Sequence, residues 1–465
     1  MSVETESRTA GAVPLGLESE LGKPRSEWTT ADLTKLFKSR QIRIVSLMHV
    51  GGDGWLKTLD FVPRSVEHLA DIIDGGERAD GSSLFPGTGI RPQASDIVLR
   101  PRPESAFLHP FSSLPTLVLM CGHAARDHTP LPQSPDTILR RAGDLLKKEA
   151  GTELWALGEV EYFLGKRRDE FDIYGANEHG YHASSPFVVG EALRREALAI
   201  LDDIGVGVKY GHSEVGYVAS KEINGMVWEQ HEIELALSPL INAAEGVLLT
   251  QWVLRNLAHN KGMQCDTAPL VAEGHAGSGL HFHFAPVRDG VPLPIKQEDG
   301  SLTEAARWLI GGLVQMGGAL MAFGNRTNDS FVRLKQAKEA PNAIVWGEFN
   351  RSALVRLPIV HQDASGRVIG TPTIEFRLPD GSALPHLLLA GAAIASLHGR
   401  ATDDLDALLE QTAATYDGDS DGIRRRVPRN PEEVADALAG FRETLERGGV
   451  FPSGLIERVE KGLKG

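Results

Sequence analysis

Cysteine is nearly absent from the sequence, which has only Cys121 and Cys265 among its 465 residues, far apart in the chain. A disulfide scaffold and a zinc knuckle both need paired or closely spaced cysteines, so neither is expected. The first 16 residues are polar and acidic and lack the apolar centre of a signal peptide. The longest apolar run, 387–397, is too short to span a bilayer. These absences predict a protein of the reducing cytoplasm that has no membrane partner.

The sequence also lacks an excess of positive charge. Its 48 lysines and arginines stand against 62 aspartates and glutamates, which gives a formal net charge of −14. Because nucleic-acid binding needs a basic surface, no nucleic-acid partner is expected. No GxxxxGK[ST] motif occurs, so a nucleotide site of the Walker type is excluded. The hydrophobic fraction of 42% and the charged fraction of 24% are those of an ordinary globular protein.

Helix and strand patterns alternate along the chain and predict an α+β fold in two domains. Residues 1–26 have the composition of a flexible tail, 27–130 form a small unit, and 131–465 form the larger domain. Strands of the small unit are predicted at 41–50, 54–63 and 114–122. Periodic apolar residues predict helices at 31–40, 65–74, 135–150, 190–203, 243–260, 303–322, 384–398 and 430–449.

One loop of the small unit is unusually long. Residues 75–89 are rich in Gly and Ser, and loops of this length often carry function. The alternative interpretation is the disordered tip of a hairpin.

Three predicted strands of the larger domain carry polar side chains on one face. Because side chains alternate along a strand, residues two positions apart project together. The pairs are Glu159 with Glu161 in 157–164, His281 with His283 in 276–284, and Glu375 with Arg377 in 374–380. Such faces suit a site for metal ions and charged substrates and are poorly suited to a core.

Carboxylates dominate the candidate metal ligands. The set consists of Glu159, Glu161, Glu214, Glu232, Glu375 and His281. Oxygen ligands with a single nitrogen suit Mg²⁺ or Mn²⁺ better than zinc, which prefers Cys and His. Any one glutamate alone is more simply a solvated surface acid, and His283 alone could be a hydrogen-bonded core imidazole. The metal-site interpretation therefore depends on the group.

Four arginines form a second candidate set: Arg333, Arg351, Arg356 and Arg377. Guanidinium groups bind carboxylate and phosphate through two bonds and stabilise charge on a phosphoryl group in transit. They could instead pair with surface acids. However, the segment 323–358 contains proline and Asn-Arg pairs, which are not typical of a solvated helix face. Both sets together predict phosphoryl transfer, in which divalent ions bridge a nucleotide and an acidic substrate.

Nine short motifs occur in an order that resembles type I glutamine synthetases, from about residue 32 to the C-terminus. They are ADGSS at 79–83, GEVEYF at 158–163, GY at 180–181, EV at 214–215, EQHEIE at 229–234, GSGLHFH at 277–283, FVRLKQAKEAP at 331–341, NRSALVRLP at 350–358 and IEFRLPD at 374–380. The resemblance implies a β-grasp-like N-terminal domain and a catalytic domain whose antiparallel sheet forms a funnel-shaped site. It further implies ATP, two or more Mg²⁺ or Mn²⁺ ions per site, and a homo-oligomer of two stacked hexameric rings, a homododecamer.

The resemblance also implies a role for each candidate residue. The ion nearer the substrate would be held by Glu161, Glu214 and Glu232, and the ion bridging the ATP phosphates by Glu159, His281 and Glu375. Binding of glutamate would involve Arg333, Arg377 and the backbone of Gly277, and binding of the nucleotide would involve His283, Arg351 and Arg356.

The amine pocket follows from the same resemblance. Asp80, from a neighbouring subunit, matches the residue that captures ammonium, and Glu339 matches the glutamate of the closing flap. Tyr181 and Ser83 would line this pocket. Their joint presence favours ammonia over a bulky amine.

The sequence departs from the family pattern in several places. An insertion at 216–228 separates Glu214 from the EQHE motif, so Glu222, Glu229 or Glu234 could compete with Glu232 as ligand. Four substitutions touch the substrate and nucleotide contacts of the family: Leu270 with Val271, Ala276, Ala285 and Thr373. The metal-ligand set is intact.

Three functions remain compatible with the sequence. The first is an ATP-dependent ligase that joins ammonia to the γ-carboxylate of L-glutamate through a γ-glutamyl phosphate, giving glutamine, ADP and phosphate. The second is a γ-glutamyl ligase for another amine, such as an alkylamine, ethanolamine or a polyamine. The third, a catalytically silent structural or regulatory protein, would have no reason to keep all six metal ligands.

Overall fold

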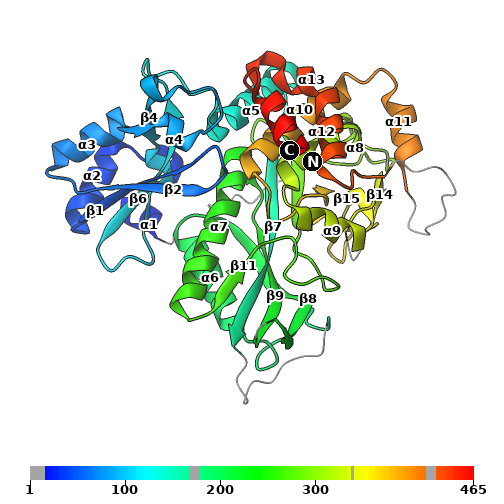
Figure 1. The fold of residues 1–465 in the computed structure, drawn as a ribbon, viewed down its shortest axis with the longest axis horizontal. Helices are drawn as coiled ribbons and strands as arrows, with labels where there is room; N and C mark the ends of the chain where they lie inside the picture. The colour runs from blue at the N-terminus through cyan, green and yellow to red at the C-terminus, as the bar shows by residue number, and fades with distance from the viewer. Residues whose placement is uncertain (1–15, 168–177, 224, 337–339, 415–425) are drawn as a thin grey trace. The chain divides into compact units, whose positions relative to one another are not determined.

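The computed structural model describes residues 16–167, 178–223, 225–336, 340–414 and 426–465. Two compact units are present. The N-terminal unit extends to Thr137 and takes in Ala199–Val206, and the C-terminal unit consists of Ile138–Leu198 and Gly207–Gly465. Figure 1 shows their elements in chain order.

The N-terminal unit is built on a six-stranded sheet in the order β2-β1-β6-β4-β3, with β5 paired to β6. Its strands are β1 (Ile44–Val50), β2 (Leu56–Phe61), β3 (Glu77–Asp80), β4 (Asp96–Pro101), β5 (Phe107–Leu108) and β6 (Thr116–Ala124). β1 and β6 pair in parallel at the centre, and the other pairs are antiparallel. A hairpin joined through a helix to a central parallel pair is the β-grasp-like arrangement that was predicted.

Short helices accompany this sheet: α1 (Leu17–Leu21), α2 (Thr30–Ser39), α3 (Val66–Gly75) and α4 (Gly81–Leu84), with 3₁₀ turns at Arg25–Glu27, Pro92–Ala94 and Pro103–Ser105. α2 begins where predicted, because Thr29 and Asp32 form a capping box. Its buried Leu33 and Leu36 join one hydrophobic core with Leu47 and Leu119 of the sheet. The apolar spacing in the sequence therefore specifies both elements.

The Gly- and Ser-rich segment 75–89 contains regular structure rather than a plain loop. It forms β3 and the one-turn helix α4, with Asp80 as the N-cap of that turn. A bare hairpin tip is therefore the wrong interpretation of this segment.

The C-terminal unit contains a ten-stranded sheet whose main path runs β14-β15-β16-β12-β7-β9-β8. Its strands are β7 (Glu153–Arg167), β8 (Val208–Ile223), β9 (Met226–Leu235), β10 (Ser238–Pro239), β11 (Gln264–Asp266), β12 (Leu280–Arg288), β13 (Val291–Pro292), β14 (Ala343–Glu348), β15 (Ala353–Leu357) and β16 (Ile374–Phe376). The pairs are antiparallel, as predicted, except for the parallel pair β14–β15. The α+β fold class is thus confirmed.

The helices of the described residues after Ser134 are α5 (Pro135–Ala150), α6 (Glu191–Asp203), α7 (Leu240–Asn260), α8 (Glu304–Gly324), α9 (Asn328–Gln336), α10 (Pro385–Arg400), α11 (Leu405–Thr412), α12 (Pro431–Gly440), α13 (Arg442–Glu446) and α14 (Leu455–Lys464), with a 3₁₀ turn at Arg447–Gly449. They include α7 and α8, which contact strands of this sheet (Figure 1). α8 and α10 touch backbone to backbone, because a Cβ on Gly312 would lie 1.8 Å from the carbonyl oxygen of Ala395. Glycine is required at that crossing.

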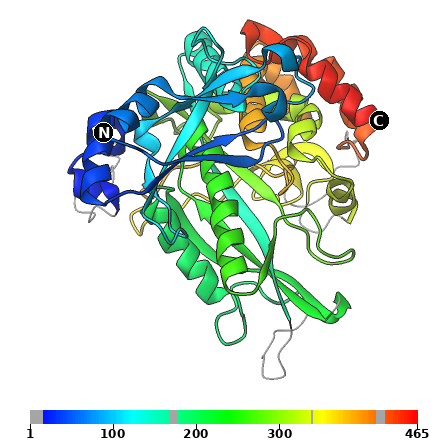
Figure 2. The same ribbon diagram turned by 60° about the vertical axis from the view of Figure 1, so that its left-hand side comes forward.

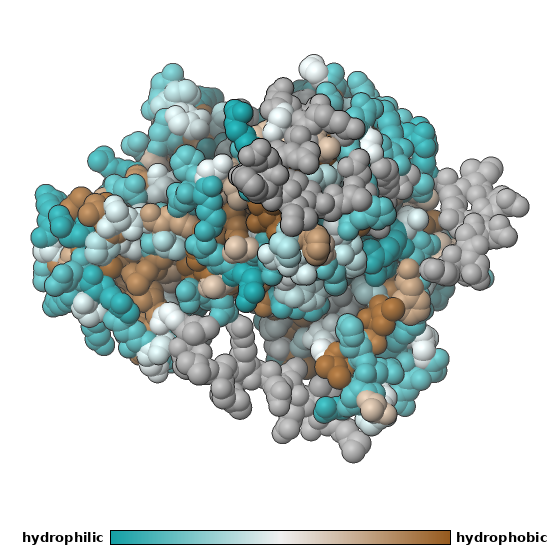
Figure 3. Space-filling view, turned by 90° about the horizontal axis from the view of Figure 1, so that it is seen from below, coloured by the Kyte–Doolittle hydropathy of each residue, from teal (hydrophilic) through white to brown (hydrophobic). Residues whose placement is uncertain are grey.

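α8 has the length and apolarity of a membrane-spanning helix, but 83% of its apolar window is buried inside the protein. A central core helix meets the same length and composition criteria. Figure 3 shows a largely hydrophilic face of the molecule with scattered hydrophobic patches between polar side chains.

Two predicted elements are shorter than expected. The helix predicted at 430–449 breaks at Phe441, whose φ of −115° and ψ of 14° are not helical, so α12 and α13 are separate. The strand predicted at 374–380 ends at Phe376. Pro379 follows closely, and proline cannot donate a hydrogen bond within a strand ladder.

The inserted segment 216–228 extends a hairpin. β8 and β9 continue their pairing beyond Tyr217 and Glu229 to Ile223 and Met226. The paired ends project from the C-terminal unit in both ribbon views (Figures 1 and 2). The insertion therefore lengthens two strands and leaves the sheet order unchanged.

Candidate active site

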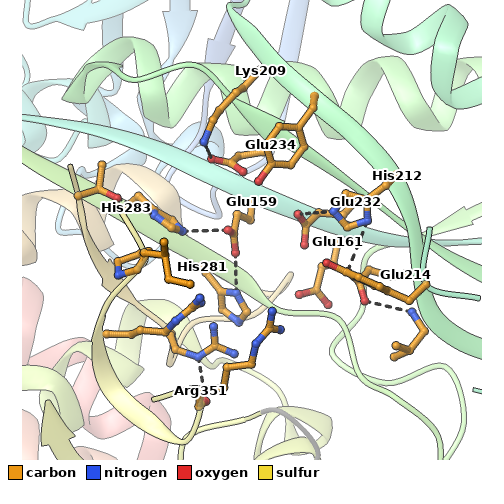
Figure 4. A pocket seen from close by; sticks show the side chains of 18 of the residues that line it. Glu159, Glu161, Lys209, His212, Glu214, Glu232, Glu234, His281, His283 and Arg351 are labelled. Carbon is orange, nitrogen blue, oxygen red and sulfur yellow. Dashed lines mark hydrogen bonds and ion pairs between the residues drawn. The ribbon is translucent and has the colours of Figure 1, made fainter. Parts of the chain in front are cut away.

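A cavity of about 620 Å³ lies within the C-terminal unit and is lined by the polar faces of its central strands. The predicted residues that line it are Glu159, Glu161, Tyr181, Glu214, Glu232, Gly277, His281, His283, Arg333, Arg351, Arg356 and Arg377. Glu375 joins them through direct contacts with His281 and two of these arginines. Figure 4 shows the acidic and imidazole side chains facing one another across the cavity.

Strand register brings the donors together. In the antiparallel ladders, His281 of β12 is opposite Glu159 of β7. Glu161 of β7 is opposite Glu232 of β9, and Glu232 is opposite His212 of β8. Since directly opposite residues lie on one face of a sheet, four neighbouring strands place their polar residues on the cavity wall.

Glu159 is held between two imidazoles. Its carboxylate oxygens lie 2.8 Å from His281 Nδ1 and 2.9 Å from His283 Nε2. Burial alone raises the pKa of Glu159, but the two histidines outweigh it and hold this pKa well below its ordinary value. Burial likewise lowers the pKa of His283, and Glu159 more than reverses this, so the net shift is upward.

The other ring nitrogen of His283 has a partner at a position where the sequence departs from the family. His283 Nδ1 lies 2.9 Å from Thr373 Oγ1. Thr373 therefore fixes the orientation of this imidazole.

Glu375 is completely buried and lies between two arginines. Arg356 Nη1 donates to Glu375 Oε2 at 2.7 Å, and Arg377 Nη1 donates to Oε1. Burial alone would raise the pKa of Glu375, but the charge of Arg377 and of the neighbouring histidines lowers it below its ordinary value. The prediction that Glu375 and Arg377 share a face agrees with this contact.

A second group of donors surrounds Glu232. Ligand atoms of His212, Glu214 and Glu232 all lie within 4.8 Å of one another. Burial and then the charges of Glu159 and Glu161 raise the pKa of Glu232 well above its ordinary value. Carboxylates this close repel each other when all are ionised, so a cation or a proton must be shared among them.

His212 was missed by the sequence analysis. It lies two positions before Glu214 on β8, and the same alternation that paired the other donors would have found it. Its Nδ1 lies 3.1 Å from the carbonyl oxygen of Ser213, and its Nε2 lies 3.4 Å from Glu232 Oε1.

Glu234 was considered only as a competitor of Glu232, and Lys209 was not considered. Lys209 Nζ donates to Glu234 Oε1 at 2.6 Å, although the Glu234 side chain is 2% exposed and that of Lys209 is 52% exposed. Figure 4 shows this pair at the end of the cavity beside Glu159. Lys209 thus supplies Glu234 with a positive charge from the chain itself.

One buried nitrogen in the site is suited to a metal ion. His281 Nδ1 bonds Glu159, and His281 Nε2 is buried with no hydrogen-bond partner among the described residues. A buried polar atom without a partner is costly, so such an atom in a functional site calls for a bound group. With carboxylates around it, this unpaired imidazole nitrogen fits a divalent cation.

Gly277 and Arg333 form one part of the cavity wall. A Cβ on Gly277 would lie 2.6 Å from the carbonyl oxygen of Pro269 and 2.9 Å from Arg333 Cγ. Gln230 Nε2 donates to both Glu161 Oε2 and the Gly277 carbonyl, at 2.9 and 3.0 Å. This turn therefore accepts only glycine and presents the Arg333 guanidinium at the cavity.

Three predicted residues lie elsewhere. Asp80 and Ser83 belong to the N-terminal unit, where Asp80 accepts hydrogen bonds from Ser82 and Ser83 that hold its pKa below the ordinary value. Glu339 lies outside the described residues. Their roles remain predictions.

Comparison with known proteins identifies relatives over most of the chain. Residues 132–458 match the family model described as glutamine synthetase, catalytic domain. A glutamine synthetase of Thermus thermophilus is 30% identical over 386 residues, which cover 80% of each chain. A glutamine synthetase of Neisseria gonorrhoeae is 29% identical over 91% of this chain and 93% of its own.

Proteins with other names are also similar. A 3-hydroxylaminophenol mutase of Cupriavidus pinatubonensis is 29% identical over 92% of this chain and 93% of its own. Among solved structures, Plasmodium falciparum glutamine synthetase has a TM-score of 0.77 at 18% identity, covering 94% and 95% of the two chains. A complex of GmaS with ADP has a TM-score of 0.74 at 20% identity, covering 93% and 94%. At these identities the structural likeness shows the fold alone.

Proposed function

The chain belongs to the glutamine synthetase family of ligases, and on that premise we propose that it joins ammonia to the γ-carboxylate of L-glutamate at the expense of ATP. The products would be glutamine, ADP and phosphate, with γ-glutamyl phosphate as the intermediate. The observation that carries the proposal is the cavity in which carboxylates, histidines and four arginines converge, with His281 Nε2 unpaired.

The donors divide into two sets around the cavity. Glu159, His281 and Glu375 would hold one divalent ion, although the ligand atoms that lie within 4.8 Å of one another there are those of Glu159, His283 and Glu375. Glu161, Glu214 and Glu232 would hold another, and the ligand atoms of Glu214 and Glu232 lie within 4.8 Å of one another and of His212. Bound Mg²⁺ or Mn²⁺ would neutralise the charge of the ATP phosphates and lower the barrier to their transfer.

Arginines would act on the anions of the reaction. Arg333, which lies against the Gly277 turn, and Arg377 would bind carboxylate, while Arg351 and Arg356 would contact phosphate; all four line the cavity. A guanidinium group fits both anions through two parallel hydrogen bonds. His283, fixed by Glu159 and Thr373, would lie beside the nucleotide.

Capture of the amine requires an anion that stays ionised. The serine hydrogen bonds of Asp80 keep this carboxylate charged, which supports a role in binding ammonium when it comes from an adjacent copy of the chain. Such a site needs an oligomer, and two stacked hexameric rings in the cytoplasm remain our expectation. Glu339, which matches the flap glutamate of the family, would close the pocket.

A second candidate is ligation of a larger amine. Tyr181 stacks on His182 with ring centroids 4.3 Å apart, and Tyr181 meets His212 edge to face at 5.4 Å. Tyr181 is 49% exposed and lines the cavity near Glu214. An aromatic wall beside a carboxylate is able to bind an organic ammonium group.

Phosphate release measured with ATP, glutamate, Mg²⁺ and a panel of amines tests both candidates. The panel is ammonium, methylamine, ethanolamine and putrescine. The highest kcat/KM with ammonium supports the first candidate, and the highest value with an organic amine supports the second. Absence of turnover with every amine would refute both.

A further inference from the structure

A zwitterionic α-amino acid needs two charged partners, and the cavity offers several acids for its ammonium group. The arginines supply partners for the α-carboxylate, so the question is which carboxylate remains for the α-ammonium. The carboxylates on the described cavity wall are Glu159, Glu161, Glu178, Glu214, Glu232, Glu234 and, through its contacts, Glu375.

Most of these acids are already assigned to a cation or to a lysine. Five of them form the two cation-binding sets of the proposed function. Glu234 is paired with Lys209 at 2.6 Å. Glu178 is the acid that neither the cation sets nor the lysine engages.

Glu178 is held at the glutamate end of the cavity. Its Oε2 accepts a hydrogen bond from the backbone N–H of Ala276 at 3.1 Å, and its Oε1 lies 3.2 Å from His275 Nδ1. The next residue is Gly277, which packs on the stem of Arg333. Glu178 and Arg333 therefore meet the same two-residue turn, one with negative and one with positive charge.

Ala276 leaves this position without a polar side chain of its own. The methyl group of alanine cannot accept a hydrogen bond, so Ala276 offers the cavity only its backbone. The carboxylate of Glu178, bonded to the Ala276 amide, supplies an acceptor at the same place. Its side chain is 28% exposed and lines the cavity.

We propose that Glu178 binds the α-ammonium group of the amino-acid substrate and makes the site selective for α-amino acids over simple dicarboxylates. The inference rests on the proposed function, because it assumes that glutamate binds with its α-carboxylate at the arginines. A carboxylate–ammonium hydrogen bond is charge-assisted and stronger than one between neutral groups.

The test compares glutamate with glutarate, which lacks only the α-amino group. Glu178→Gln keeps an acceptor for the Ala276 amide and removes the charge. For this variant kcat/KM with glutamate should fall roughly 10- to 100-fold, the effect of losing one hydrogen bond to a charged group. The value for glutarate should stay level or rise, and the KM values for ATP and amine should not change.

Glu196→Gln serves as the matched control, since Glu196 is an exposed acid of α6 that pairs with Lys261 at 2.7 Å. It should leave all these constants at their wild-type values. An equal fall for glutamate and glutarate in Glu178→Gln would overturn the inference, and so would an effect confined to the KM of the amine.

A binding measurement separates this inference from the proposed function. Thermal shift with glutamate or glutarate in the absence of ATP needs no turnover. Wild-type protein should be stabilised more by glutamate than by glutarate, and Glu178→Gln should be stabilised equally by both. If that difference is seen but no amine gives phosphate release, the proposed function fails while the role of Glu178 stands. No difference between the two acids in wild-type protein would refute the role of Glu178.

Discussion

Removal of the Glu375 charge is the most direct test of the cation site. Glu375→Gln keeps the size of the side chain but leaves Arg377 and Arg356 without their buried counter-charge. Because Glu375 is completely buried and Arg377 is 2% exposed, solvent cannot compensate. Loss of one partner of a buried ion pair typically costs about 3–5 kcal/mol.

That cost is smaller than the stability of a typical domain, about 5–15 kcal/mol, so the variant should still fold at 25 °C. The urea concentration at the midpoint of unfolding should nevertheless be lower for the variant than for the wild-type protein. Turnover should fall much further, because loss of a metal ligand exceeds the roughly 10- to 100-fold effect of losing an outer-shell partner. Mn²⁺ affinity, measured by calorimetry, should drop together with turnover.

Glu348→Gln is the matched control, because Glu348 is an exposed acid of the same sheet that pairs with Lys296 at 2.6 Å. Surface pairs of this kind contribute little, so stability and Mn²⁺ binding should be unchanged. If Glu375→Gln instead turned over at the wild-type rate with unchanged Mn²⁺ affinity, Glu375 would not be a metal ligand.

Two further predictions concern protons and the amine. Burial and neighbouring carboxylates raise the pKa of Glu232, so the stability that its proton contributes is fully present below the ordinary value of 4.5 and is lost as pH rises through the higher folded value. Mn²⁺ binding at a pH below that folded value should therefore release a proton, seen by calorimetry in two buffers of different ionisation enthalpy. Glu232→Gln should release none, and an equal release from both proteins would contradict the assignment. Asp80→Ala should raise the KM for the amine far more than that for ATP or glutamate in steady-state assays, and equal effects on all three would exclude its role in amine capture.

Local patterns in the sequence were sufficient for most elements of the fold. Apolar spacing predicted α2, α3 and α5, and Thr29 and Pro135 marked where α2 and α5 begin, because these residues act on their own helices. The break at Phe441 was not predicted, since the apolar periodicity of 430–449 continues across it. Backbone dihedrals at one residue leave no periodic signal.

Alternation along single strands identified three pairs of residues at the cavity in advance, namely Glu159 with Glu161, His281 with His283, and Glu375 with Arg377. Register between strands was not readable, because β7, β9 and β12 are far apart in the sequence and their pairing depends on the folded sheet. Lys209 on β8 was missed for that reason. Glu178 lies in a turn and was missed because its partner is also distant in the sequence. Each acquires its meaning from a partner on another segment, Glu234 and the Ala276 amide respectively.

Charge pairs between side chains of the site explain why its acids are tolerated inside a folded unit. Glu159 is paired with two histidines, Glu375 with two arginines and Glu234 with a lysine, while burial and then the neighbouring carboxylates raise the pKa of Glu232. An isolated buried carboxylate costs several kcal/mol, so these pairings let the sheet form before any cation binds. A cation must then compete with a proton on Glu232 and with the imidazoles for Glu159, which makes its affinity rise with pH. Under the proposed function the divalent ions would serve the phosphoryl chemistry, whereas the folded state depends on the pairs that the chain provides itself.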